Sequence, residues 1–148
     1  MRVGTYLVAP AAAALLFAIG GGAAADEAAV KYREAVMEAV GGHTKALGAI
    51  VKGEVAHVGD LKTHVAALDA LATMSQHIFP TAPESEKSEL LPAAWEKPQE
   101  FKQALVAFET AAGGLARAAA ADPSPKGIAP AFGELAKTCK SCHDSFKK

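Results

Sequence analysis

The chain has 148 residues, of which 51% are hydrophobic and 21% charged, and its formal charge at pH 7 is −1. This balance excludes a strongly basic surface of the kind that binds nucleic acid, and the length suits one domain with a modest core. The near-neutral, slightly acidic charge allows weak, salt-sensitive docking to a basic patch on a partner protein.

Residues 1–25 have the features of a secretory signal peptide. Arg2 supplies the positive charge at the start, residues 11–19 are apolar, and Ala23 and Ala25 form an A-x-A cleavage site. Since Arg2 is the one charged residue in this stretch, its removal would leave 14 basic and 16 acidic side chains. We therefore expect export to the periplasm and a mature charge of −2.

The mature protein is expected to begin at Asp26 and to form a single domain over residues 26–148. An uncleaved membrane anchor is the alternative, since the uncharged run approaches the ~20 residues that span a bilayer. Pro10 and the glycines at 20–22 disfavour a spanning helix. No stable membrane insertion is expected after cleavage.

The first half of the mature sequence predicts two helices. Between residues 28 and 52, mainly apolar side chains recur at intervals of seven residues, as on the buried face of a bundle helix. The glycine pair at 41–42 weakens helix propensity, so close packing or a slight kink is expected there. A second helix is expected from Asp60 as N-cap to Ile78, ending before Pro80.

The second half predicts a long connection and two further helices. The connection, residues 80–98, contains four prolines and Trp95, which is expected to cover the core or a cofactor edge, or to pack on the surface. A third helix is expected from Pro98 to Asp122, and a fourth from about Gly127. Apolar residues and both cysteines follow one face of the fourth: Ile128, Phe132, Leu135, Cys139, Cys142 and Phe146. The resulting fold class is all-α, an antiparallel four-helix bundle.

Cys139 and Cys142 are the only cysteines of the chain, and His143 follows directly. The C-x-x-C-H pattern is the attachment signature of c-type haem. Two thiols three residues apart on a helix can each form a thioether with one vinyl group of the same porphyrin, and the adjoining imidazole can bind the iron. A structural disulfide, a zinc half-site or a redox cysteine pair fits less well, because a zinc site needs four ligands and a redox pair normally opens a helix after a strand.

The expected topology also suggests a sixth iron ligand. In an antiparallel bundle, Met37 on the first helix lies level with His143 near the end of the fourth. A thioether is a soft, neutral ligand that suits haem iron. Met74 and His77, at the end of the second helix, are the competitors, and simple core filling is the other interpretation of Met37.

The chain resembles the cytochrome c′ family, also called class II cytochromes c. The resemblance rests on four stretches and covers essentially all of residues 28–148: Val30-Lys31-Tyr32-Arg33, Val51-Lys52-Gly53-Glu54, Trp95 before a helix, and Cys139 to Asp144. It implies a left-twisted bundle, often a homodimer through the first and second helices, and pairing of Arg33 with a haem propionate. Methionine at position 37 implies the low-spin, six-coordinate branch. Lys147 stands where many relatives have arginine.

Two functional classes follow from these patterns. The leading prediction is an exported one-electron carrier with a His143/Met37-ligated haem. The alternative is a five-coordinate protein that binds nitric oxide or carbon monoxide. A peroxidase would need a distal acid–base histidine, and His43, His57 and His64 have no spacing that places them over the iron, so the protein is not expected to be an enzyme.

Overall fold

The chain is described by a computed structural model covering residues 1, 22–81, 83 and 87–148. The predicted signal peptide, residues 1–25, lies almost wholly outside this part. The helices of the described residues are α1 (Gly22–Val51), the short 3-10 helix η1 (Val58–Asp60), α2 (Leu61–Ile78), α3 (Ala93–Glu96), α4 (Pro98–Ala121) and α5 (Pro125–Phe146).

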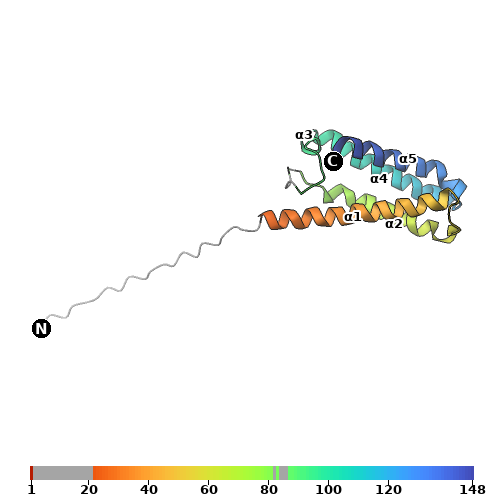
Figure 1. The fold of residues 1–148 in the computed structure, drawn as a ribbon, viewed down its shortest axis with the longest axis horizontal. Helices are drawn as coiled ribbons and strands as arrows, with labels where there is room; N and C mark the ends of the chain where they lie inside the picture. The colour runs from red at the N-terminus through yellow and green to blue at the C-terminus, as the bar shows by residue number, and fades with distance from the viewer. Residues whose placement is uncertain (2–21, 82, 84–86) are drawn as a thin grey trace.

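Four long helices form the bundle (Figure 1). In sequence order α1 packs against α2, α2 against α4 and α4 against α5, and α5 closes the bundle on α1. The links from α1 to α2 and from α4 to α5 lie at one end, whereas α3 and the C-terminus lie at the other (Figure 1). The predicted all-α four-helix bundle is confirmed. Over the described residues, none of the helices combines the length and the apolar character that crossing a membrane requires.

The glycine pair at 41–42 lies in the middle of α1. The helix runs without a break through Gly41 and Gly42. A Cβ atom added at either glycine would meet nothing within 4 Å, so no neighbouring protein atom requires a glycine at these positions. No protein atom packs closely on either glycine. Gly41 borders the cavity described below, so close packing or a slight kink at this point stays a prediction.

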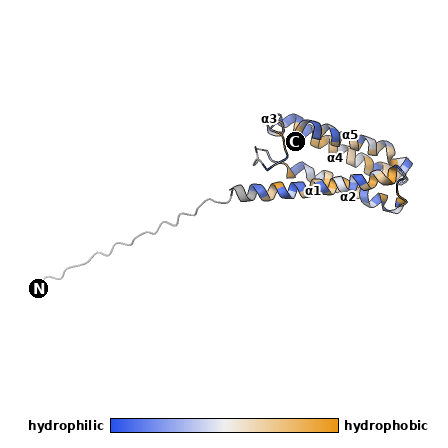
Figure 2. Cartoon of the chain, viewed as in Figure 1, coloured by the Kyte–Doolittle hydropathy of each residue, from blue (hydrophilic) through white to orange (hydrophobic). Residues whose placement is uncertain are grey.

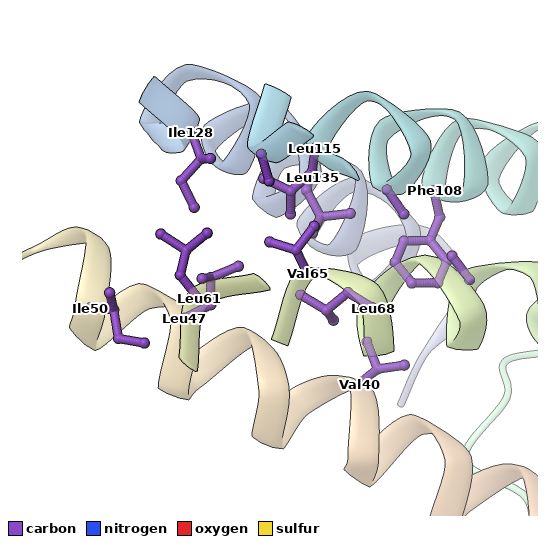
Figure 3. Close-up of a cluster of buried hydrophobic side chains, with 13 residues drawn as sticks. Val40, Leu47, Ile50, Leu61, Val65, Leu68, Phe108, Leu115, Ile128 and Leu135 are labelled. Atoms are coloured by element: carbon purple, nitrogen blue, oxygen red, sulfur yellow. The ribbon is translucent and has the colours of Figure 1, made fainter. Parts of the chain in front are cut away.

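The main core lies in the half of the bundle nearer the short links, and Figure 3 shows its side chains packed between the helices. Hydrophobic and polar residues alternate along each helix with helical period, so that one side of each faces inward (Figure 2). Six large side chains in this cluster have almost no exposed surface: Leu47, Leu61, Leu68, Leu115, Ile128 and Leu135. They come from α1, α2, α4 and α5, so this cluster holds all four helices in register.

Helix α5, which carries both cysteines, begins earlier than predicted. Ser124 is its N-cap, and the side-chain Oγ accepts a hydrogen bond of 3.0 Å from the backbone N–H of Gly127. Pro125 occupies the first helical position, where its missing N–H costs nothing. Pro130 consequently lies in the second turn rather than the first, and it cannot donate to the carbonyl of Lys126.

Replacing Ser124 with alanine is expected to lower the free energy of unfolding by about 1 kcal/mol, because the Gly127 N–H loses its acceptor. Chemical denaturation followed by far-UV circular dichroism measures the change. Ser145→Ala is the matched control, since Ser145 is an exposed serine in the same helix. Equal effects of the two substitutions would show that the cap contributes nothing.

Candidate functional site

A cavity of about 620 Å³ lies inside the bundle, between α1, α4 and α5 and the end of α2. Its volume falls within the ~300–1,000 Å³ typical of ligand and cofactor pockets. The cavity separates the main core from a second cluster formed by Leu90, Ala94, Phe101, Leu105 and Phe146. The bundle is therefore packed with side chains near the short links and hollow nearer the opposite end.

The α5 wall of the cavity carries the complete C-x-x-C-H motif. Cys139 packs against the main core and Cys142 against the second cluster, so the two thiols reach both ends of the hollow region. Both cysteines are free and half-buried. Burial raises the pKa of each thiol, and the neighbouring Cys139 adds to the effect at Cys142. Redox cysteine pairs have lowered thiol pKa values, so this environment does not fit a redox pair.

His143 lies at the mouth of the same cavity, exposed on its outer side. The pKa of its imidazole is lowered, first because the ring loses water on the cavity side and then because of the positive charge of Lys147. Both effects favour the neutral ring, which is the form that binds metal ions. Two free thiols, a neutral imidazole and a hollow of this size together fit a c-type haem.

Arg33 is the buried charge of the cavity wall, with 4% of its surface exposed. Its Nη2 donates a hydrogen bond of 3.1 Å to Ser88 Oγ, and its guanidinium carbon lies 5.5 Å from the centre of the Phe79 ring. The guanidinium is therefore held in place rather than extended to solvent. Such a held cation suits a negatively charged group within the cavity.

Met37 is half-buried on the α1 wall, and it also touches the main core. The competing candidates Met74 and His77 are not among the described residues that line the cavity. Helix register thus places the α1 methionine, and neither α2 residue, in the same hollow as His143. Lys147 also borders this cavity.

The connection between α2 and α3 contributes residues to the cavity wall that the sequence did not single out. Leu90 forms an isolated antiparallel bridge with Lys147, and the Glu89 Oε2 atom lies 3.0 Å from Lys147 Nζ. Buried Ser88 accepts the hydrogen bond from Arg33 described above. Glu89 and Leu90 line the cavity. The apolar pair at 90–91 within a polar connection was the one sequence signal for this contact.

Trp95 packs partly buried against the second cluster, in α3. It is not among the described residues that line the cavity, so it covers core rather than the cofactor space.

The histidines His43, His57 and His64 also lie outside the lining of the cavity. His43 and His64 are half-buried, and His57 is exposed.

Known proteins similar to this chain are cytochromes. Cytochrome c′ of Pararhodospirillum photometricum is 36% identical over 84% of this chain and 100% of its own length. Cytochrome c′ of Alcaligenes xylosoxydans xylosoxydans is 31% identical over 84% of this chain and 97% of its own length. A solved structure of a ferrous variant of cytochrome c prime from Alcaligenes xylosoxidans, with bound NO, superposes with a TM-score of 0.74 at 31% identity, covering 83% of this chain and 95% of the other.

These findings overturn the leading functional prediction, the six-coordinate electron carrier ligated by His143 and Met37. The two relatives named above are cytochromes c′, and the related solved structure holds NO. Binding of a diatomic gas at haem iron needs an axial position that no protein ligand permanently fills. Assignment to the low-spin branch is not supported, because a methionine in a cavity wall is equally suited to packing.

The family model described as Cytochrome C' matches residues 28–147, which is nearly the whole of the expected mature domain. The matched region includes all four long helices from residue 28 onward, the cavity and the C-x-x-C-H motif. The chain therefore belongs to the cytochrome c′ family, whose members carry covalently attached c-type haem.

Proposed function

We propose that this chain is an exported cytochrome whose five-coordinate haem binds nitric oxide or carbon monoxide. The observation that carries the proposal is the cavity, which has the C-x-x-C-H motif on its α5 wall and the flexible side chain of Met37 on its α1 wall. The NO held by a related protein supports the same interpretation. We propose a binding protein rather than an enzyme.

Each residue of the cavity wall would have a separate role in binding the haem and the gas. Cys139 and Cys142 would hold one haem through two thioethers, and the neutral ring of His143 would bind its iron. When bound, the haem supplies the iron at which a gas molecule coordinates. Arg33 would stabilise a propionate, and Met37 would limit the space available to a ligand without donating its sulfur. A homodimer through α1 and α2, and docking to redox partner proteins, remain predictions.

Gas binding tests the proposal directly. The ferrous haem-loaded protein is expected to show a high-spin optical spectrum and to form a carbon monoxide complex on addition of the gas. The ferric protein is expected to lack the near-infrared band that reports sulfur–iron ligation. A low-spin ferrous spectrum that carbon monoxide does not change would contradict the proposal.

Export is expected to be necessary for haem attachment. A variant lacking residues 1–25 and expressed in the cytoplasm should contain no covalent haem, because thioether formation of this type occurs outside the bacterial cytoplasm. Acid–acetone extraction of the washed polypeptide measures the retained haem, with the full-length chain as the control. Haem that stays with the cytoplasmic polypeptide would show that export is not required.

Replacing Arg33 with leucine is expected to lower the haem reduction potential, because a nearby cation stabilises the less positive ferrous state. An interaction on the order of 1 kcal/mol corresponds to roughly 40 mV for a one-electron couple. Redox titration measures the shift, and Arg33→Lys is the charge-retaining control. A variant with lower thermal stability but an unchanged potential would show that Arg33 acts only through Ser88 and Phe79.

A further inference from the structure

His43 and His64 form a pair on the α1–α2 side of the bundle, outside the lining of the haem cavity. His43 belongs to α1 and His64 to α2, which pack side by side (Figure 1). Their Nδ1 atoms are joined by a hydrogen bond of 2.9 Å, in which one ring donates and the other accepts, and the ring planes are inclined by 62°. We propose that this pair is a binding site for a divalent late transition-metal ion, with Cu²⁺ as the preferred ion.

The choice of metal rests on the two imidazole ligands and on the angle that they can make at an ion. Two imidazole ligands, each about 2.0–2.1 Å from a metal ion, lie about 2.9 Å apart when the angle at the metal is 90°, and about 3.3 Å apart at the tetrahedral angle. The observed 2.9 Å is the length of the hydrogen bond in the metal-free pair, so an ion that replaces the shared proton would require only a small shift of the rings to reach the first geometry. Right angles between neighbouring ligands are typical of tetragonal Cu²⁺ and Ni²⁺ sites, and affinity for nitrogen ligands is highest for Cu²⁺. Zn²⁺ should bind more weakly.

The bundle holds the two rings in position before any ion arrives. One helical turn from His43 lies Leu47, and one turn from His64 on either side lie Leu61 and Leu68. All three leucines have 0% of their surface exposed and belong to the main core. The two histidines are thus anchored by the best-packed part of the protein, which lowers the entropic cost of bringing the ligands together.

The surface around the pair leaves room for an ion and its water. Gly42, which is exposed and directly precedes His43, has no atom within 4 Å of an added Cβ, whereas the space at Gly41 belongs to the haem cavity. Among the described residues, no group of three or more histidine, cysteine or acidic side chains could hold a metal ion. The site therefore offers two protein ligands, and water or another small ligand completes the coordination.

Titration of the exported, haem-loaded protein with CuCl₂, followed by calorimetry and electron paramagnetic resonance, tests the proposal. One equivalent of Cu²⁺ should bind, with hyperfine splitting from two nitrogens. His43→Ala and His64→Ala should each weaken binding by ~10-fold or more, since loss of even an outer-shell partner costs about that much. The exposed His57 and His77 provide control variants, His57→Ala and His77→Ala, whose affinity should not change.

Three outcomes overturn the proposal. The first is unchanged affinity in both His43→Ala and His64→Ala, which would place copper at the chain terminus or at exposed histidines. The second is an equal loss in the His57 or His77 control. If the alanine variants fail to fold, as judged by circular dichroism and haem absorbance, the wild-type resonance spectrum decides, and coupling to fewer than two nitrogens rejects the site.

Discussion

Replacing both Cys139 and Cys142 with serine is expected to abolish covalent haem attachment and to lower the stability of the bundle strongly. The hydroxyls cannot form the thioethers, so extraction with acid–acetone should remove all haem from the polypeptide. Each single substitution should leave one attachment point. Ser141→Ala, at the exposed position between the cysteines, is the matched control and should retain its haem.

The loss of stability follows from the size of the cavity. Cavity formation costs about 24 cal/mol per Å³ in protein cores. If a quarter of the 620 Å³ hollow, roughly 150 Å³, stayed unfilled, the cost would be on the order of 4 kcal/mol. That is a large part of the ~5–15 kcal/mol by which domains are stable. Thermal unfolding of the washed, haem-free variant should therefore begin far below that of the wild type. An unchanged melting temperature would show that the hollow closes without haem.

Replacing Met37 with alanine is expected to speed carbon monoxide binding to the ferrous protein by ~10-fold or more, which corresponds to about 1.4 kcal/mol in the barrier. The reason is steric, because the methionine side chain lines the α1 wall of the cavity and a gas molecule needs part of that space. Flash photolysis measures the association rate. The spin state of the haem should not change.

Met74→Ala provides the control for this experiment, because Met74 is also half-buried but is not among the described residues lining the cavity. Its association rate should equal that of the wild type. A contrary outcome is specific: a wild-type protein that is low-spin, and a Met37→Ala variant that becomes high-spin, would show that sulfur binds the iron. The gas-binding proposal would then be wrong.

The ligand state of Met37 illustrates a limit of sequence reasoning. Helical periodicity placed this residue on an inward face of α1, and the structure places it in the cavity wall. The same thioether can fill space or bind iron, and both uses require the same inward position. Position alone therefore could not choose between the two functional classes, and the relatives that are cytochromes c′ favour the gas-binding one.

The sequence by itself determined the four long helices and the haem motif, because both depend on local spacing. Helix formation follows from apolar residues at helical period, and the attachment signature occupies five consecutive residues, from Cys139 to His143. Proline and capping residues placed the helix ends to within a few positions. The main differences between the predicted and observed helices are that α1 and α5 begin earlier in the structure.

Only the tertiary structure decided which distant residues meet. Arg33 and Ser88, 55 positions apart, share a hydrogen bond because the connection before α3 folds back over the cavity. His43 and His64 face each other at 2.9 Å because α1 and α2 pack in one particular register. Such contacts depend on the relative rotation and translation of whole helices. Those are set by the summed packing of the core, which no local pattern of residues specifies.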